Sequence, residues 1–258
     1  MLAASWNVNG LRARLDFVLH WLRARRPDLV LLQELKLTDD QFPAAELEAE
    51  GYFAGIHGQK AWNGVAVLSR EKPRVIQAGL PGQEPMGSRL VACGVGSLQA
   101  LSVYVPNGKS LDHPDFQHKL EWIERLHGFL EESFDPGEAI LVAGDFNLCP
   151  TPLDTWNEEA FEGTIFHTER ERELFAALTA WGLEDLYRNL HPDEQTFSWW
   201  DYRGGAFHKN QGLRIDFTLG TASLGRRVLR AEVDRDYRKK KDGLTPSDHA
   251  PILVEFED

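Results

Sequence analysis

Short apolar runs alternate with amphipathic segments along the whole chain. Apolar runs bounded by Gly, Pro, Asn or Asp are typical of strands, and they cover residues 2–8, 28–34, 64–69, 89–95, 98–106, 139–146, 214–220 and 250–257. Helical periodicity appears over residues 11–26, 115–134 and 169–188. Many strands with few helices predict an α/β fold, in which helices lie outside a core of two sheet layers.

The chain shows no internal repeat, no low-complexity tract and no linker between these segments. Its Pro- and Gly-bearing stretches are each a few residues long, as loops within one domain are. The two irregular stretches span residues 149–168 and 199–212, and long ordered loops of this size often border sites. We therefore expect residues 1–258 to form a single domain.

Composition excludes several classes of protein. The 258 residues are 42% apolar, which is enough for a sizeable buried core. No apolar run approaches the ~20 residues that span a bilayer, and the sequence MLAASWNVNG lacks a signal-peptide layout, so a cytoplasmic protein with no membrane partner is expected. Cys93 and Cys149 have no disulfide or zinc-type spacing, so each is expected to be a buried small side chain.

The net charge of −12 weighs against a generic nucleic-acid binder. It is compatible with an enzyme that holds a divalent cation in a pocket of carboxylates. Basic residues cluster over residues 12–26, 225–233 and 236–243. Such clusters are usually solvated faces or loops, and only several of them facing one groove would form a phosphate-binding surface.

Polar side chains recur where the predicted strands end. Asn7 and Asn9 follow the first apolar run, although asparagine at such a place is often only a turn former. Glu34 follows the second run, where a partly buried carboxylate needs a cation or hydrogen-bond donors. Asp145 and Asn147 stand two residues apart, so on an extended segment both side chains leave the same face. This pairing favours metal or water binding over a tight turn.

An acidic residue inside one strand needs a partner elsewhere in the chain. Asp216 lies between Ile215 and Phe217, where an unsatisfied carboxylate would be costly. His249 is a candidate partner, because a histidine oriented by a carboxylate commonly holds a proton or binds a phosphate. A satisfied core histidine is the alternative. The adjacent Asp248 can point to the other face, so Asp248 and Asp216 need not have the same role.

Together these residues form a candidate metal site. The candidate metal ligands are Asn7, Glu34, Asp145, Asn147, Asp248 and His249, with Tyr104 as a further hydrogen-bond donor. Hard oxygen ligands without thiolates indicate Mg²⁺ or Mn²⁺ rather than zinc. Such a metal can neutralise a phosphodiester and position an attacking water. The residues alone therefore indicate a metal-assisted hydrolase and name no substrate.

Seven motifs then carry a resemblance that covers nearly the whole chain. They are WNVNGLRAR, LLQELK, GQKAWNGVAVLS, VYVPNG, GDFNLCPTPLD, FSWWDYRGGAFHKNQGLRIDF and PSDHAPI, in this order from residue 6 to residue 252. The sequence resembles the exonuclease III family of apurinic/apyrimidinic (AP) endonucleases, within the endonuclease/exonuclease/phosphatase superfamily. GDFN and SDH are shared across the superfamily, whereas LQELK, WWDYR and GLRID together are more specific to the exonuclease III branch.

The resemblance implies a fold and an activity. The fold is a DNase I-like, four-layered α/β sandwich of two packed, mainly antiparallel sheets flanked by helices. The activities are cleavage of DNA 5′ to abasic sites, 3′–5′ exonuclease action on duplex DNA, and removal of 3′ blocking groups as a 3′-phosphatase or 3′-phosphodiesterase. The implied cofactor is Mg²⁺ or Mn²⁺. The implied partner is double-stranded DNA with abasic sites or 3′ ends, bound by a monomer.

The resemblance also implies roles for single residues. The catalytic set is Tyr104, Asp145, Asn147, Asp216 and His249. Glu34 resembles the principal metal ligand, with Asn7 beside it and Asp248 as a further acidic residue. Asp145 resembles the residue that activates the attacking water or protonates the leaving group, and Asn147 resembles the group that positions it. Tyr104 lies next to the scissile phosphate in the family, and Asp216 and His249 form a pair that contacts it.

DNA contacts are expected from a wider set: Asn9, Lys36, Arg89, Asn107, Lys109, His167, Trp199, Trp200, Arg203, Lys209, Asn210, Leu213 and Ile215. Trp199 and Trp200 could be core residues, or could line a pocket for a flipped-out abasic sugar together with Leu213 and Ile215. Residues 156–167 have no clear family counterpart, so the resemblance does not identify the side chain that wedges into the duplex, and His167 is our candidate for it.

Two other functions are compatible with the same superfamily. One is a phosphatase or phosphodiesterase acting on lipids or small molecules, against which WWDYR and GLRID argue. The other is a catalytically inactive member that binds RNA or a protein as a regulator, with which the acidic charge is compatible. Every expected catalytic position nevertheless holds its expected residue, so we expect an active DNA repair nuclease.

Overall fold

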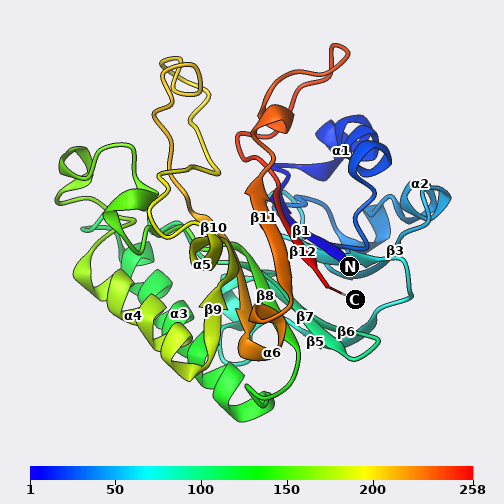
Figure 1. The fold of residues 1–258 in the computed structure, drawn as a ribbon, viewed down its shortest axis with the longest axis horizontal. Helices are drawn as coiled ribbons and strands as arrows, with labels where there is room; N and C mark the ends of the chain where they lie inside the picture. Colours follow the sequence, from blue (N-terminus) through cyan, green and yellow to red (C-terminus); the bar gives the residue numbers. More distant parts are fainter. Residues whose placement is uncertain (258) are drawn as a thin grey trace.

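Two six-stranded sheets packed face to face form the centre of the molecule in the computed structural model, which describes residues 1–257 (Figure 1). The first sheet has the order β11 (Val228–Val233), β12 (Ile252–Phe256), β1 (Leu2–Asn7), β2 (Leu29–Gln33), β4 (Val65–Ser69), β3 (Phe53–His57). The second has the order β5 (Arg74–Ala78), β6 (Leu90–Val95), β7 (Leu98–Tyr104), β8 (Ile140–Asp145), β10 (Asp216–Thr221), β9 (Leu183–Asp185). Pairing is antiparallel except for β1 with β2 and β7 with β8.

The α-helices are α1 (Leu11–Arg25), α2 (Ala44–Ala49), α3 (Pro114–Ser133), α4 (Glu169–Trp181), α5 (Leu186–Leu190) and α6 (Ala222–Gly225). Helices α1 and α2 cover the outer face of the first sheet and α3 and α4 that of the second, whereas the short α5 and α6 pack into the core between the sheets. Trp21 of α1 packs with Leu32 of the first sheet, whereas Trp122 of α3 packs with Phe217 of the second. The four-layered α/β sandwich predicted from the sequence is therefore confirmed. Within the described residues, no helix combines the length and the apolar character that crossing a membrane requires.

The central strands are apolar on both faces because both faces are covered. In β2, Leu29 and Leu31 belong to the core between the sheets, whereas Val30 and Leu32 pack in the core under α1. A strand with two buried faces reads as a continuous apolar run rather than as an alternation. This explains why the sequence predicts the central strands so clearly. Cys93 and Cys149 are both buried free thiols, as expected.

The strands that the sequence analysis missed are the four that end the sheets, β3, β5, β9 and β11. Residues of β5 and β11 are largely exposed or half-buried. Edge strands with so little buried apolar surface give a weak periodic signal. The short helices α2 and α6 were missed as well.

The predicted helix over residues 169–188 is wrong in its continuity, because residues 182–185 interrupt it. Helix α4 ends at Trp181, followed by Gly182 with a φ of 133°. The chain then forms the short edge strand β9 before α5 begins. Glycine reaches this backbone conformation without the steric cost that a side chain adds, so it is a common stop signal for a helix.

Gly144 in β8 is a position where the packing of strands depends on the absence of a side chain. A Cβ atom there would lie 1.8 Å from the carbonyl oxygen of Val103. Gly144→Ala is therefore expected to lower the free energy of unfolding by at least about 1–3 kcal/mol, the usual cost of overpacking. Urea unfolding measures the change. Gly128→Ala within α3 is the control, since alanine is favoured there by about 0.5–1 kcal/mol, and an equal loss in both variants would contradict the steric explanation.

Candidate active site

Five strand ends meet at one edge of the two sheets. Because β1 and β2 run parallel, Asn7 and Glu34 arrive at the same edge of the first sheet. Tyr104 and Asp145 do the same at the ends of the parallel strands β7 and β8, where they are register partners. Asp216 begins the antiparallel strand β10 directly opposite Asp145. The topology thus gathers polar residues from distant parts of the sequence.

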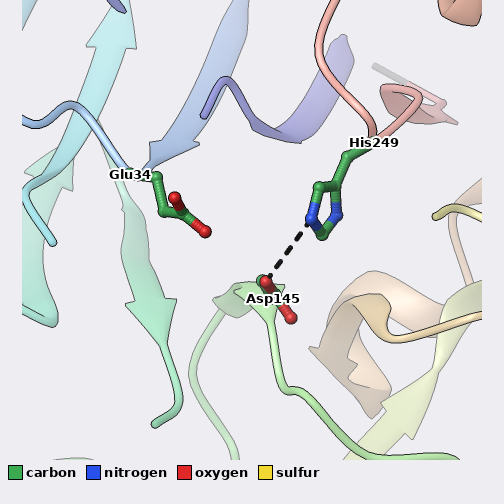
Figure 2. Close-up of side chains that lie close together, drawn as sticks. All are labelled: Glu34, Asp145 and His249. Atoms are coloured by element: carbon green, nitrogen blue, oxygen red, sulfur yellow. Dashed lines mark ion pairs between the residues drawn. The ribbon is translucent and has the colours of Figure 1, made fainter. Parts of the chain in front are cut away.

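Glu34, Asp145 and His249 form the centre of this arrangement (Figure 2). One ligand atom from each lies within 4.8 Å of the others, which is a spacing that can hold a metal ion. His249 Nε2 lies 3.8 Å from Asp145 Oδ2. Asp145 and His249 are buried, whereas the Glu34 side chain keeps 16% of its surface exposed. An ion held here would therefore be reached from the side of Glu34.

The Glu34 carboxylate is held by three polar neighbours. Tyr104 donates its hydroxyl to Oε1 at 2.8 Å, and Asn7 donates Nδ2 to the same atom at 2.9 Å. Lys36 Nζ lies 2.9 Å from Oε2. Burial alone would raise the pKa of Glu34, but Lys36 and the Asn7 hydrogen bond outweigh it and keep the pKa below its usual value. Glu34 is thus an anion that offers oxygen to a cation.

Asn7 joins the two acidic residues as a donor. Its Nδ2 donates to Glu34 Oε1 and to Asp145 Oδ2, both at 2.9 Å. Its Oδ1 accepts from the backbone N–H of Asn9 at 3.0 Å. We expected Asn7 to contribute an oxygen ligand, whereas in this arrangement its oxygen faces the backbone. Its Nδ2 thus links the two carboxylates, and its role as a metal ligand stays a prediction.

His249 and Asp216 form the predicted contact. His249 Nδ1 lies 2.8 Å from Asp216 Oδ2, which also accepts from the hydroxyl of Ser198 at 2.6 Å. Burial lowers the pKa of His249, but the Asp216 carboxylate outweighs it and raises the pKa to about 10. The imidazole therefore favours its charged form, which can stabilise negative charge on a phosphate.

The pKa of Asp145 shifts in the opposite direction to that of Glu34. Burial, reinforced by the facing Asp216 carboxylate, raises the pKa of Asp145 to about 8. Its Oδ1 accepts from the backbone N–H of Asn147 at 2.9 Å. A carboxyl with a pKa near neutrality is suited to take a proton from water or to return one to a leaving group.

Asp248 lies apart from the central group. Its Oδ1 accepts from Asn9 Nδ2 at 2.8 Å, and its Oδ2 accepts from Trp199 Nε1 at 3.0 Å. Burial would raise the pKa of Asp248, but His249 and these donors keep it low. Both oxygens of Asp248 thus accept hydrogen bonds from Asn9 and Trp199, and its role as a metal ligand stays a prediction. The adjacent side chains of Asp248 and His249 therefore contact different partners, Asn9 and Trp199 in one case and Asp216 in the other.

Asn147 is fixed by a buried ion pair that the sequence gave no reason to expect. Its amide accepts from Asn107 Nδ2 at 3.1 Å and donates to the carbonyl of Val105 at 2.9 Å. Its own carbonyl accepts from Lys119 Nζ at 2.5 Å, and Lys119 also pairs with Glu171. Both members of the pair are fully buried. A lysine in an amphipathic helix normally faces solvent, so sequence reasoning missed it.

Known proteins resemble this chain in both sequence and fold. The sequence pattern of the Endonuclease/Exonuclease/phosphatase family matches residues 4–249. The chain belongs to this family. It is 36% identical to an exodeoxyribonuclease III from Haemophilus influenzae, over 98% of each chain. It also superposes on an AP endonuclease from Archaeoglobus fulgidus with a TM-score of 0.95 and 32% identity, covering 100% of both chains.

A further structural relative was determined with DNA. It is a 3′ phosphatase from Neisseria bound to a product DNA hairpin, 36% identical, with a TM-score of 0.95, covering 100% of this chain and 99% of that one. The resemblance stated from the motifs is confirmed by these matches. The assignment to a DNase I-like α/β sandwich is confirmed with it.

An open groove adjoins the Glu34 side of the site in this family member. It has a volume of about 930 Å³, and its lining includes Glu34, Arg89, Tyr104, Asn107 and Lys109. Arg89 lies over the Tyr104 ring, 4.7 Å from its centroid. Trp62 lines the same groove with 70% of its surface exposed. An exposed tryptophan beside a polar groove was a signal within GQKAWNGVAVLS that the sequence analysis did not use.

The residues expected to contact DNA divide by exposure. Exposed ones are Asn107, Lys109, Arg203, Lys209 and Asn210, and partly exposed ones are Asn9, Lys36, Arg89 and Trp199. Lys109 pairs with Asp115 and Arg203 pairs with Asp201, so both cations already have a carboxylate partner. These nine residues keep surface that DNA can reach.

Burial changes the interpretation of the other four. Trp200 is fully buried and packs with Phe197, and it belongs to the core rather than to a ligand pocket. Leu213 and Ile215 are buried in a small apolar cluster with Cys149. His167 keeps only 9% of its side chain exposed and lies 3.4 Å from Glu158. In this arrangement none of the four has the exposed surface that a pocket wall or a wedge requires.

Proposed function

We propose that this chain is a divalent-metal-dependent DNA repair nuclease that hydrolyses phosphodiesters. Its activities would be those of an AP endonuclease cutting 5′ to abasic sites, a 3′–5′ exonuclease on duplex DNA, and a 3′-phosphatase or 3′-phosphodiesterase. Family membership and the names of the full-length relatives support the nuclease assignment. No observation favours an inactive binding protein.

One observation carries the proposal. Two buried or half-buried carboxylates, Glu34 and Asp145, face a histidine that Asp216 holds in its charged form. A purely structural group would have no need for two acidic side chains so close together, since like charges in a buried site oppose each other. The combination of an anionic cation site with a cationic imidazole suits a phosphodiester and its metal.

The donor set fits Mg²⁺ or Mn²⁺. Carboxylate oxygens are the ligands that these hard cations prefer. Both cysteines are buried free thiols, and neither belongs to the candidate ligand group. Glu34 and Asp145 would hold the ion, with His249 at the border of the site. When bound, the ion would neutralise the phosphate and acidify a water molecule.

The remaining residues would divide the chemistry. Asp145, with its pKa near neutrality, would accept the proton of the attacking water or supply one to the departing 3′ oxygen. The charged His249 would donate to a non-bridging phosphate oxygen, with Asp216 holding its ring. Tyr104 would keep Glu34 in place through its hydroxyl, and Asn147 would fix the loop after β8.

The proposal predicts metal-dependent cleavage of two substrates. An abasic duplex and an undamaged 3′-recessed duplex are each expected to be cut in the presence of Mg²⁺ or Mn²⁺. EDTA should abolish both reactions because Glu34 and Asp145 would be left without the cation that draws the phosphate to them. Gel analysis of labelled strands measures both activities.

Re-addition of the metal is the control for EDTA. Recovery with Mg²⁺ or Mn²⁺ but not with an excess of monovalent salt would support the assignment, and comparing the two ions would settle the preferred metal. Full cleavage in EDTA would contradict it, as would cleavage of an inositol phosphate in preference to DNA. The monomeric state and the cytoplasmic location stay predictions, as does the single domain over residues 1–258.

A further inference from the structure

A second cavity lies on the far side of the segment that carries His249. It measures about 370 Å³ and lies between residues 201–208 and residues 238–246. We call it the loop pocket, and its lining includes Tyr202, Phe207, Arg238, Lys239, Lys240 and Pro246. Figure 1 shows both segments rising from the same end of the molecule. Glu34, Asp145 and His249 are not part of its lining, so it is separate from the active site.

Arg238 is a buried cation that forms no ion pair with a carboxylate of the described residues. Only 7% of it is exposed, and it donates to the carbonyls of Asp248 at 3.1 Å and Trp200 at 3.2 Å. Within residues 1–257, no carboxylate lies within ion-pair distance of its guanidinium. Carbonyl oxygens solvate this charge, but they do not neutralise it. An anion bound in the loop pocket would neutralise the charge of Arg238.

Aromatic rings hold the guanidinium in place. It lies 4.8 Å from the centroid of the Tyr202 ring and 5.2 Å from that of Phe207. Contacts of this kind fix the orientation of an arginine without neutralising its charge. Tyr202 is in turn fixed by its hydroxyl, which donates to the carbonyl of Pro246 at 2.9 Å. The cation is therefore preorganised rather than mobile.

Two exposed lysines add positive charge at the mouth of the loop pocket. Lys239 lies 3.1 Å from the exposed Asp236, and Lys240 is exposed beside it. The carboxylate on the opposite wall, Asp201, is engaged by Arg203 at 2.7 Å. In a chain with a net charge of −12, this is a local excess of cations. Such a concentration attracts an anionic polymer against the overall charge.

We propose that the loop pocket and the lysines at its mouth bind neighbouring backbone phosphates of duplex DNA, next to the phosphate that is cleaved. Arginine and lysine are the usual phosphate-binding residues, and contacts of this type position DNA without reading its sequence. The loop pocket shares the segment of residues 246–249 with the active site, because Arg238 bonds to the carbonyl of Asp248 and Tyr202 to that of Pro246. This inference rests on the proposed nuclease function.

The test removes the two exposed lysines and compares the salt dependence of DNA binding. The variant is Lys239→Ala/Lys240→Ala, and binding of a labelled abasic duplex in EDTA is followed by fluorescence anisotropy. Because each phosphate contact contributes about −0.9 to the slope of log K against log salt, losing two contacts makes the slope shallower by about 1.8. The ratio of the variant's Kd to that of the wild type should then fall about tenfold between about 50 and 200 mM salt.

A charge-matched control is available at the other end of the sheets. Lys72 and Arg74 are exposed and follow the end of β4 that pairs with Leu29, away from Glu34. Lys72→Ala/Arg74→Ala is expected to keep the wild-type slope. An unchanged slope in the Lys239→Ala/Lys240→Ala variant, or an equal change in the control, would overturn the loop pocket as a phosphate site.

Cleavage assays on the same proteins separate the two proposals. The lysine variant is expected to raise the KM for duplex DNA with kcat unchanged, because neither lysine lines the active site. A wild-type protein that binds duplex DNA with a metal present but never cuts it would refute the nuclease function alone. In that case the salt slopes would still decide whether the loop pocket binds phosphate.

Discussion

Asp145→Asn is expected to lower kcat for strand incision at an abasic site by at least about a hundredfold, the low end of the range for loss of a general acid or base. Asparagine keeps the shape of the side chain but can neither accept the proton of a water molecule nor offer a negatively charged oxygen to a cation. Single-turnover incision of a labelled abasic duplex with Mg²⁺ measures the change. His249→Ala is expected to produce a loss of similar size.

The fold should survive the Asp145→Asn substitution. A carboxyl whose pKa is raised in the folded state favours folding in its protonated form, and that contribution is lost as the pH rises through the raised value of about 8. The neutral asparagine removes this penalty, so the metal-free variant should unfold at the same or a higher urea concentration. Asp16→Asn on the exposed face of α1 is the control for activity. Near-normal incision by both Asp145→Asn and His249→Ala would overthrow the proposed mechanism.

The parts of the fold that the sequence predicted are those with the most buried apolar surface. Each of the eight predicted strand segments contains a central strand, whereas the missed strands β3, β5, β9 and β11 lie at sheet edges. Edge strands pack on fewer neighbours, so their sequences need not alternate or be apolar throughout. The edge strands were therefore missed for a physical reason. An apolar pattern in the sequence reflects burial of the strand, and burial is lowest at the sheet edges.

The candidate site was predictable as a set of residue types and less so as a set of contacts. The pairing of His249 with Asp216 followed from the cost of a lone carboxylate in a strand, and the structure places them 2.8 Å apart. Asn7 and Asp248 were expected to face the metal, but which way an amide or a carboxylate points depends on neighbours far along the chain, here Asp145 for Asn7 and Trp199 for Asp248. Sequence patterns do not contain that information.

Burial of single residues was the hardest property to predict. Trp200 and Leu213 occur in a loop that the motifs place near DNA, yet both side chains are buried. Lys119 occurs among polar residues in an amphipathic helix, yet it is fully buried against Glu171. Both outcomes depend on what packs against the segment, which is decided by tertiary structure rather than by local pattern.

Lys119→Met is expected to lower the free energy of unfolding by about 3–5 kcal/mol, the usual cost of leaving a buried charge without its partner. Glu171 would keep its hydrogen bonds from Thr168, which donates its backbone N–H at 3.0 Å and its hydroxyl at 2.8 Å, but would lose its cation. Urea unfolding measures the change. Arg170→Met is the control, because Arg170 is half exposed and its surface ion pair with Glu173 contributes about 0–1 kcal/mol.

The double variant Lys119→Met/Glu171→Gln distinguishes a lost ion pair from lost packing. If the cost arises from the unpaired Glu171 charge, removing that charge should restore part of the stability and give a coupling energy in a double-mutant cycle. Lys119→Met should also reduce incision, because Nζ no longer holds the carbonyl of Asn147, and the reduction should appear in kcat rather than in KM. Additive losses in stability, with normal kcat in the single variant, would show that the buried pair neither depends on its charges nor positions the loop after β8.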